Sequence, residues 1–409
     1  MIKLLVRCVG WGQDWPLGTL ADNGTALLFE YSATALTRGI EFSPLRLRLR
    51  VAAYGGFPGH QDRLPGLLAD ALPDGWGRLL MDRLWRKAGR DPTRLSPLDR
   101  LAFVGDRTIG AFAFEPPADV GVTPVDIELL TLARESRKVI ADRESAALRA
   151  LAVLGGSPQG ARPKVLVQYD AATGVVSSDP TATGSPWLIK FQAADEHKEA
   201  CAVEELYARM ARACGLVVPV THYFDLAPKL AAFGVARFDR EGGCRVPVHT
   251  LAGALDADIR TPALDYATFL RAVRAITGDE REVRKGFEVA TFNVLMHNRD
   301  DHARNLSFRM SREWRWQLAP SYDLSYSEGP GGEHQMSVLG EARDPGRRHL
   351  LALAQDAALD AVWACGVLDR MVAVAAELKR GAAELPIRRA TVAAIVAAVE
   401  RNRKRVGSG

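Results

Sequence analysis

The chain has 409 residues, a net charge of +4 and 47% hydrophobic residues, which predicts a soluble globular protein with two or three packed units. It contains no run of about 18 apolar residues, so no membrane span is expected, and its first residues lack the features of a signal peptide. The five cysteines are scattered without a CxxC pair, which argues against a disulfide framework or zinc site and favours a reducing cytoplasm. The slight positive charge permits an acidic partner but does not require nucleic acid.

The first region, up to about residue 116, combines short strands with helical segments. Alternating leucines and arginines predict a strand at 45–54. Residues 64–88 predict two helices that are interrupted by the turn signal at 73–75. A Pro/Gly-rich joint at 116–124 is expected to close this region.

The second region, from about 151 to 240, is predicted to be a sheet with one helix. The predicted strands are 164–170, 186–192, 218–224 and 230–238, and the predicted helix is 196–214. From about residue 248 the sequence is rich in alanine with helical periodicity, and its basic stretch at 401–405 is expected to be frayed. A β-rich unit followed by a helical unit is the layout of a two-lobed kinase, although many α+β proteins share it.

The segment FNVLMHNRDDHARNLSF, at 292–308, is the most informative one for chemistry. Asp300 and Asn305 are five positions apart, like the Asp and Asn of the protein-kinase catalytic loop HRDxxxxN. In that loop the carboxylate accepts the proton of the attacking hydroxyl, and the amide oxygen binds magnesium on the phosphates. Asp323 follows 18 residues later, beyond a strand-like segment, where a kinase places its second metal-binding carboxylate.

Simpler interpretations exist for single residues of this segment. An Asp and an Asn at this spacing are more often a solvated turn and a helix cap. His297 and His302 could be zinc ligands, but on a helix they would face different sides, and no HExxH pattern is present.

Two features upstream favour the kinase interpretation. Lys190 lies in the apolar segment PWLIKFQ, where a lysine costs free energy unless it is paired; the plain alternative is a lysine on a wet face. Before it, the glycines of 154–164 leave backbone N–H groups able to approach phosphate oxygens. Glycine-rich loop, lysine, Asp–Asn pair and later aspartate occur in this order, which together favours an ATP-dependent kinase.

These residues and the longer phrases around them resemble the HipA family, the serine/threonine kinase toxins of bacterial toxin–antitoxin pairs. LPGLLADALPDGWGRLLMDR (64–83) and SPLDRLAFVGDRTIGAFAFEP (96–116) resemble the family's N-terminal unit. The layout and the resemblance together predict an α+β, two-lobed protein-kinase-like fold with a β-rich N-terminal region and an all-helical C-terminal lobe. The expected domains are a HipA N-terminal subdomain at 1–116, a kinase N-lobe at 125–247 and a helical C-lobe at 248–409.

The resemblance implies a role for each motif. NRDDHARNLSF resembles the catalytic loop, with Asp300 as base and Asn305 as metal ligand, and APSYDLS adds Asp323 as the other metal ligand. GGSPQGARPK resembles the loop SxxGAxxK, whose serine is autophosphorylated, which implies Ser157 as the phosphorylation site. GVARFDR (234–240) resembles the stretch that joins the lobes and holds adenine through its backbone. The implied ATP-binding residues are Gln159, Gly160, Ala161, Arg162, Pro163, Lys164, Lys190, Ala236, Arg237, Phe238, His302, Asn305 and Asp323.

The sequence departs from the family pattern at three positions. Ala236 stands where a glutamate is usual, Arg299 where a small residue such as Thr is common, and Asn298 in place of the HRD histidine of eukaryotic kinases. Because adenine recognition would rest mainly on backbone groups, we expect little loss from Ala236. Arg299 bears on how the substrate approaches.

The family implies a cytoplasmic, growth-inhibiting kinase that uses ATP and Mg2+ and phosphorylates a cytosolic protein such as an aminoacyl-tRNA synthetase. It also implies a HipB-like helix-turn-helix antitoxin, through which operator DNA would mainly be bound. One alternative is a kinase of small molecules, against which the N-terminal phrases argue. The other is a catalytically weak co-repressor that acts with a DNA-binding antitoxin, against which the intact Lys190, Asp300, Asn305 and Asp323 argue.

Overall fold

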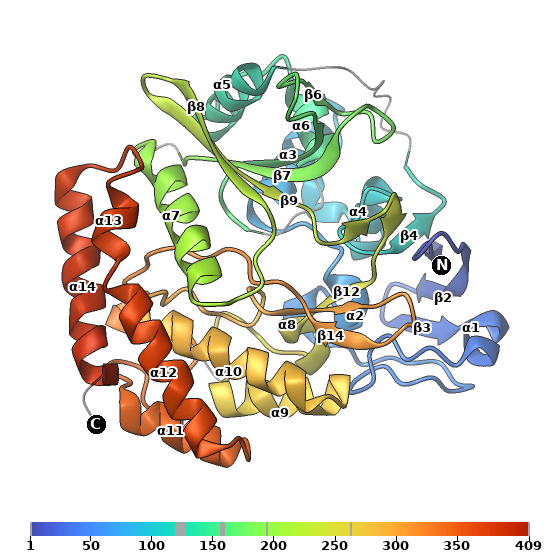
Figure 1. Ribbon diagram of the computed structural model, residues 1–409. Helices are drawn as coiled ribbons and strands as arrows, with labels where there is room; N and C mark the ends of the chain where they lie inside the picture. The colour runs from blue at the N-terminus through green and yellow to red at the C-terminus, as the bar shows by residue number, and fades with distance from the viewer. Residues whose placement is uncertain (1, 119–127, 156–159, 194, 262–263, 408–409) are drawn as a thin grey trace. The chain divides into compact units, whose positions relative to one another are not determined.

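The computed structural model (Figure 1) describes residues 2–118, 128–155, 160–193, 195–261 and 264–407. The chain divides into two compact units. Unit 1 comprises Met1–Cys201 and Val220–His249, and unit 2 comprises Ala202–Pro219 and Thr250–Gly409. The described part of unit 1 is rich in strands and that of unit 2 is mainly helical, so the predicted mixed fold with a β-rich first part and a helical second part is confirmed.

A four-stranded antiparallel sheet begins unit 1, in the order β3-β2-β1-β4. Its strands are β1 (Ile2–Cys8), β2 (Trp15–Asp22), β3 (Leu27–Tyr31) and β4 (Phe112–Glu115). Alternate residues of β3 are buried, as in a sheet with one face on the core. The pairing of β1 with β4 brings the two ends of this region together.

Short helices connect these strands. They are α1 (Ala33–Arg38), η1 (Gly59–Gln61), α2 (Gly66–Ala69), α3 (Gly75–Lys87), η2 (Pro92–Arg94) and α4 (Pro97–Val104). The predicted interruption at 73–75 is confirmed, because α2 and α3 lie on either side of it. The predicted joint at 116–124 lies largely outside the described residues.

The predicted strand at 45–54 is wrong. Only Tyr54 pairs there, through an isolated bridge to Phe29. The carbonyl groups of Leu47 and Arg48 accept hydrogen bonds from tyrosine hydroxyl groups, at 2.5 and 2.6 Å, rather than from a neighbouring strand. Side chains therefore satisfy backbone groups that a sheet ladder would otherwise pair.

The second sheet of unit 1 has five strands in the order β6-β5-β7-β9-β8. Its strands are β5 (Lys164–Tyr169), β6 (Val176–Ser177), β7 (Ser185–Phe191), β8 (Thr221–Ala227) and β9 (Leu230–Ala236). All four predicted strands are present. The third begins at Thr221 rather than at 218, since Pro219 has no N–H to donate to a ladder.

Three helices cover one side of this sheet (Figure 1): α3 from the N-terminal region, α5 (Leu129–Ile140) and α6 (Leu148–Leu154). Trp76 and Leu80 of α3 belong to the same buried cluster as Val165 of β5 and Ile189 of β7. The N-terminal region and the five-stranded sheet therefore share one hydrophobic core.

A buried carboxylate joins two distant segments of unit 1, next to the short strands β10 (Arg240–Glu241) and β11 (Cys244–Arg245). Asp239 contacts the guanidinium groups of Arg237 at 2.7 Å and Arg240 at 2.6 Å, and it accepts from the N–H of Gly110 at 2.8 Å. Burial acts to raise the pKa of Asp239, but the two guanidinium groups outweigh it and hold that pKa well below its ordinary value. Arg245 donates to the Gly110 carbonyl at 3.0 Å, which completes the junction.

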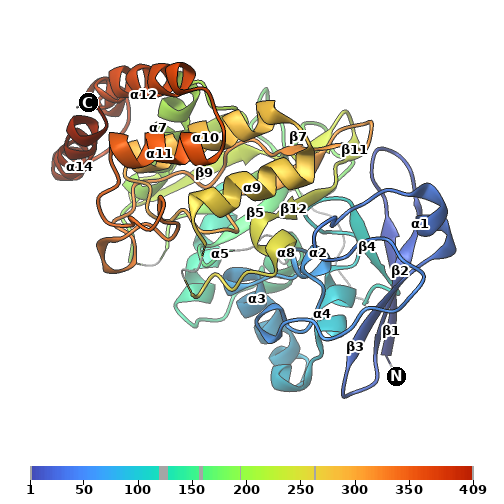
Figure 2. The same ribbon diagram turned by 90° about the horizontal axis from the view of Figure 1, so that it is seen from below.

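Unit 2 is built mainly from helices. These are α7 (Glu199–Ala213), α8 (Leu251–Leu255), α9 (Tyr266–Thr277), α10 (Glu280–Leu295), α11 (Arg347–Asp356), α12 (Ala361–Ala375), α13 (Leu378–Ala382) and α14 (Arg389–Gly407). A hairpin of β13 (Ser307–Met310) and β14 (Trp316–Leu318) and the turn η3 (Pro330–Gly332) interrupt them, so this part is helical but not all-helical as predicted. Along the chain, β12 (Val248–Thr250) spans the boundary between the residues of unit 1 and those of unit 2. Figure 2 shows α9 and α10 side by side, and α10 also packs against α12.

The basic stretch at 401–405 is not frayed, contrary to expectation. It lies inside α14, where Asn402 is buried and donates to the carbonyl group of Val294 at 2.9 Å. The aliphatic residues of α14, such as Val399 and Val406, are buried too. One face of the helix is therefore held by the unit 2 core, while the charged residues occupy the other face.

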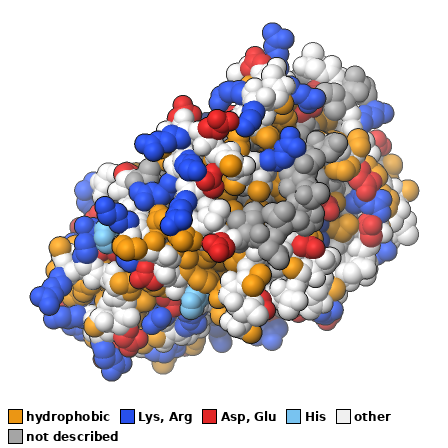
Figure 3. Space-filling model, turned by 90° about the horizontal axis from the view of Figure 1, so that it is seen from above, with side chains coloured by type: hydrophobic (Ala, Val, Ile, Leu, Met, Phe, Trp, Pro, Cys, Tyr) orange, Lys and Arg blue, Asp and Glu red, His pale blue; other side chains and the backbone are white. Residues whose placement is uncertain are grey.

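No described helix is long and apolar enough to cross a membrane. Figure 3 shows basic side chains spread among acidic and apolar ones on one face of the molecule. This mixture agrees with a net charge of only +4.

Asp239→Ala should lower the free energy of unfolding by about 3–5 kcal/mol, because it leaves buried guanidinium groups without their counter-charge. Urea denaturation followed by circular dichroism measures the change. The control is Glu144→Ala, which removes an exposed ion pair with Lys87 at 3.2 Å and should cost less than about 1 kcal/mol. Equal losses in the two variants would contradict the anchoring role of Asp239.

The pH dependence of this stabilisation follows from the lowered pKa of Asp239. The unfolded carboxyl titrates near its ordinary value of about 3.9. The contribution is therefore fully present above that pH and is lost as the pH falls through the lower pKa of the folded state.

Candidate functional site

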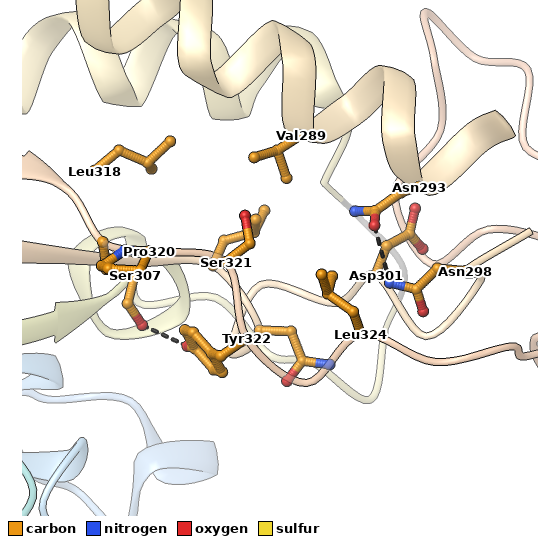
Figure 4. A pocket seen from close by; sticks show the side chains of 13 residues that line it. Val289, Asn293, Asn298, Asp301, Ser307, Leu318, Pro320, Ser321, Tyr322 and Leu324 are labelled. Atoms are coloured by element: carbon orange, nitrogen blue, oxygen red, sulfur yellow. Dashed lines mark hydrogen bonds between the residues drawn. The ribbon is translucent and has the colours of Figure 1, made fainter. Parts of the chain in front are cut away.

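The predicted catalytic loop begins where α10 ends. His297 has a left-handed backbone, with φ of 58°, and the chain turns there. The Asn298 side chain donates to Oδ1 of Asn293 at 2.9 Å, and its backbone N–H donates to the Asn293 carbonyl at 2.9 Å (Figure 4). Asn298, which stands in the place of the HRD histidine, therefore fastens the loop to α10.

Asp301 is the buried centre of the loop, with none of its side chain exposed. Its Oδ2 accepts from the Tyr266 hydroxyl at 2.7 Å and from His334 Nδ1 at 2.8 Å, and its Oδ1 accepts from the N–H of Gln335 at 2.8 Å. Burial and the nearby carboxylate raise the pKa of Tyr266 well above its ordinary value, so its hydroxyl remains a donor. Asp301 thus joins the loop to α9 and to the later segment that carries His334.

Asp300 lies next to Asp301 but has a different environment. Its side chain is 55% exposed, and its Oδ1 accepts from Nε2 of Gln335 at 2.9 Å. His302 Nε2 lies 3.8 Å from the same oxygen. Of two consecutive aspartates, one is therefore held inside the fold and the other presents its carboxylate to solvent.

Asn305 is bound to Asp300 through the backbone. Its Nδ2 donates to the Asp300 carbonyl oxygen at 2.8 Å. The amide nitrogen is thereby committed to the loop, so the amide oxygen is the atom of this side chain that suits a cation. This hydrogen bond joins Asp300 and Asn305, the two residues that their spacing in the sequence singles out.

The β13–β14 hairpin returns the chain toward Asn305. The N–H of Ala319 donates to the Ser307 carbonyl at 2.8 Å, just beyond the ends of the strands. The Tyr322 hydroxyl lies 2.5 Å from Oγ of Ser307 and donates to the Arg304 carbonyl at 2.5 Å (Figure 4). These bonds hold the residues beside Asn305 against the residue before Asp323.

Asp323 itself has a left-handed backbone, with φ of 55°. Aspartate tolerates this conformation better than most residues other than glycine, and such strained positions gather at functional sites. A pocket between the loop and the hairpin is lined by Asp301, Asn305, Tyr322 and Leu324, among other residues of unit 2 (Figure 4).

Arg299 binds the segment that follows Asp323. Only 6% of this residue is exposed, and its guanidinium group donates to the carbonyl groups of Gly332 at 2.5 Å and Arg343 at 2.6 Å. Its side chain therefore points into the fold. These bonds give Arg299 a structural role, while its bearing on the approach of a substrate stays a prediction.

Two of the predicted ATP-binding residues, both lysines, lie side by side on neighbouring strands of unit 1. Lys164 of β5 is paired in register with Lys190 of β7, the central strand of the sheet. Both residues are buried, at 3% and 6% exposure, so Lys190 lies inside the sheet and not on a wet face. Its Nζ is 5.8 Å from the centre of the Phe233 ring, within range of a cation–π contact.

The predicted phosphate loop is described only in part, because Ser157 and Gln159 lie outside the described residues. Gly160 has φ of 107°, which requires glycine. Arg162 forms an ion pair with Glu196 at 2.5 Å, and the Pro163 carbonyl accepts from the N–H of Phe191 at 2.8 Å. The end of this loop is thereby joined to β7 and to the chain just after it.

The predicted adenine-binding stretch ends β9. The N–H of Ala236 donates to the Val220 carbonyl at 2.8 Å, and the N–H of Arg237 donates to the Pro186 carbonyl at 2.9 Å. A contact between adenine and these residues would therefore use their carbonyl groups, or groups of Phe238, rather than these two amides.

Sequence reasoning missed Gln335 and Tyr322. Gln335 lies 35 positions after Asp300 and carries no motif, and Tyr322 is simply the residue before a predicted ligand. A signal in the sequence was the pair of consecutive aspartates, because a second carboxylate that becomes buried, as Asp301 does, needs partners from elsewhere in the chain.

Two family models match the chain along most of its length. The HipA N-terminal domain matches residues 10–115, and the HipA-like C-terminal domain matches residues 156–379. The chain belongs to the HipA family. The resemblance identified from the motifs is thereby confirmed.

The HipA fold is also found by comparison with solved structures. HipA of Shewanella oneidensis MR-1, solved with HipB and its operator DNA, is similar over 98% of this chain and 97% of that chain, with a TM-score of 0.72 and 19% identity. The proinflammatory kinase CtkA of Helicobacter pylori aligns with 55% of this chain and 89% of its own, with a TM-score of 0.38 and 11% identity. No curated protein matches the sequence.

The two neighbouring aspartates of this HipA chain should respond differently to substitution. Asp301→Ala should lower the free energy of unfolding by about 3 kcal/mol or more, because it leaves buried donors without an acceptor. Asp300→Ala, the matched control, should change it by about 0.5 kcal/mol, as expected for an exposed side chain. Urea denaturation compares the two, and a larger loss for Asp300→Ala would refute this division.

Proposed function

We propose that this chain is an ATP-dependent serine/threonine protein kinase that acts as the toxin of a toxin–antitoxin pair. The observation that carries the proposal is the bond from Nδ2 of Asn305 to the carbonyl oxygen of Asp300. It joins a solvent-facing carboxylate and an amide oxygen in one short loop, and the hairpin brings Asp323 back toward that loop. A base and two oxygen ligands are what phosphoryl transfer requires of a protein.

Asp300 is the proposed base. Gln335 donates to Oδ1 of its carboxylate at 2.9 Å, so Oδ2 is the proposed proton acceptor. The hydroxyl oxygen of the substrate forms a bond to the γ-phosphorus of ATP while its proton passes to Asp300, and the bond between the γ-phosphorus and the ADP oxygen breaks. Because Gln335 restricts the carboxylate to one orientation, the acceptor oxygen is positioned before the substrate binds.

Asn305 and Asp323 are the proposed ligands of Mg2+. An amide oxygen and a carboxylate are hard ligands that suit this ion, and the left-handed backbone of Asp323 is held in place by the Tyr322 bonds. When bound, the ion would offset the negative charge of the transferred phosphoryl group.

The proposed nucleotide-binding groups of unit 1 are the loop 159–164, Lys190 and residues 236–238. The buried lysines of β5 and β7 supply positive charge, and the loop supplies backbone N–H groups other than that of Gly160, which binds Asp74. We assign the HipA N-terminal subdomain to 1–116, the kinase N-lobe to 125–247 and the C-lobe to 248–409.

The proposed partners follow from the family. The similar Shewanella protein was solved with HipB and operator DNA, which supports a HipB-like helix-turn-helix antitoxin and contact with operator DNA mainly through it. The family resemblance supports an aminoacyl-tRNA synthetase as the protein substrate and action in the cytoplasm.

Asp300→Asn and Asp323→Asn should separate catalysis from metal-dependent binding. Asp300→Asn should retain Mg·ATP binding and lose transfer by about 10²–10⁴-fold, the contribution of a positioned base. Asp323→Asn keeps a residue that tolerates the left-handed backbone but should lose most Mg·ATP binding. A thermal-shift titration measures binding, since a ligand of the native state raises its melting temperature, and radiolabelled ATP measures transfer.

The wild type and the exposed-pair variant Glu144→Ala serve as controls for these two variants. Absence of any Mg·ATP shift in the wild type would favour the co-repressor alternative. Transfer to antibiotics or sugars without transfer to protein would favour the small-molecule alternative. Identical behaviour of the two variants would refute the division of roles.

Ser157 is the proposed autophosphorylation site and off switch. Incubation with Mg·ATP should add one phosphate to the wild type and none to Ser157→Ala or Asp300→Asn, as measured by intact mass. The modification adds about −1.5 to −2 charges to the proposed phosphate loop, where it would compete with the phosphates of ATP, so ATP affinity should fall. A phosphate gained by Ser157→Ala would place the site elsewhere, and unchanged affinity of the phosphorylated protein would refute the switch.

A further inference from the structure

The start of α3 holds one residue of the glycine-rich loop from both sides. A carboxylate oxygen of Asp74 accepts from the N–H of Gly160, and the N–H of Trp76 donates to the carbonyl oxygen of Gly160 at 3.1 Å. Both backbone polar groups of Gly160 are therefore bound to residues of a single short segment in the N-terminal region.

Trp76 extends this contact to the beginning of β5. Its indole Nε1 donates to the carbonyl group of Lys164 at 3.0 Å, and the residue is 1% exposed. A Cβ added to Gly155, the last described residue before the loop, would lie 2.8 Å from the same Nε1. One buried tryptophan therefore lies against both Gly155 and Lys164, which flank the loop.

The approach of the two backbones is close. A Cβ at Gly75 would lie 2.8 Å from the carbonyl oxygen of Gly160 and 2.8 Å from Cα of Ala161, so only glycine fits there. Asp74 occupies the N-cap position of α3, yet its side chain makes no capping bond to the helix. Its carboxylate accepts from the loop instead of from the helix that it precedes.

We propose that Asp74, Gly75 and Trp76 position the described end of the phosphate-contacting loop, residues 160–164, which makes the N-terminal region part of the nucleotide-binding machinery. The proposal rests on the proposed function, in that the loop binds the phosphates of ATP. A glycine-rich segment loses much conformational freedom when a ligand orders it. Holding its end in advance lowers that cost, so ATP binds more tightly than it would to an unanchored loop.

Asp74→Ala tests the role of the carboxylate, and Asp74→Asn tests whether an uncharged acceptor restores it. Asp74→Ala should raise the KM for ATP about tenfold, as expected for loss of a hydrogen bond to a charged group, and change kcat less than about twofold. Adenosine affinity should stay within about twofold of the wild type, because the effect acts through the phosphates. Asp74→Asn should bring the KM for ATP back close to the wild-type value, because Oδ1 of the asparagine still accepts a hydrogen bond from the N–H of Gly160.

Asp62→Asn is the matched control. It breaks a half-exposed ion pair of 3.4 Å between Asp62 and Arg78, a residue of α3. It should leave the KM for ATP unchanged. A second measurement needs no nucleotide: hydrogen exchange of peptides containing residues 160–164 should be faster in Asp74→Ala than in the wild type and in Asp62→Asn.

The outcomes separate the anchor from the kinase activity. Hydrogen exchange in Asp74→Ala as slow as in the wild type would contradict the anchoring role of Asp74. An unchanged KM for ATP would also contradict it. A lower KM would do so too, because it would mean that Asp74 competes with the phosphates. An equal loss of adenosine and ATP affinity would also overturn it, because the damage would then be general. If the wild type binds no Mg·ATP, the proposed function fails together with the nucleotide part of this proposal, while hydrogen exchange still decides whether Asp74 holds the loop.

Discussion

The carboxylate of Asp301 is the contact on which the candidate catalytic loop depends. It is fully buried and accepts from a tyrosine hydroxyl, a histidine and a backbone amide, so its desolvation is offset by several charge-assisted hydrogen bonds. These donors come from α9 and from the segment that carries His334 and Gln335. The exposed carboxylate of Asp300 is positioned as a result, because its orienting partner, Gln335, is itself held by Asp301.

Carboxylates that accept hydrogen bonds from backbone N–H groups also occur in unit 1. Asp239 accepts from the N–H of Gly110, and Asp74 accepts from the N–H of Gly160. In both cases a side-chain carboxylate binds the backbone N–H of a glycine, which has no side chain that could hold its position. Irregular segments carry backbone donors that no ladder satisfies, and a carboxylate from a distant segment supplies the missing acceptor while it determines where the loop lies.

The elements with strong local patterns could be predicted from the sequence. The apolar strands around Lys190 and the turn at 73–75 depend on neighbouring residues and are present as expected. The short spacing of Asp300 and Asn305 likewise places the two residues in one loop, where a hydrogen bond joins them. The alternation at 45–54 led to the wrong prediction of a strand. Tyrosine hydroxyl groups, and not a neighbouring strand, donate to the carbonyl groups of Leu47 and Arg48 there.

The contacts between distant segments could not be predicted in the same way. The bond of Gln335 to Asp300 and that of Asp74 to Gly160 join residues 35 and 86 positions apart. In the sequence, neither Gln335 nor Asp74 differs in type or spacing from an ordinary polar surface residue. Only the folded structure therefore identifies their partners.

Arg299 holds the segment after Asp323 through hydrogen bonds to main-chain carbonyl groups, those of Gly332 and Arg343. Every amino acid carries such a carbonyl, so these two hydrogen bonds do not themselves require a particular side chain. Side chains of this segment can change while the two bonds are kept, except where a left-handed backbone and close contacts require glycine, as at Gly329. The outer surface next to the proposed catalytic loop can thus vary at its other positions without loss of these two bonds.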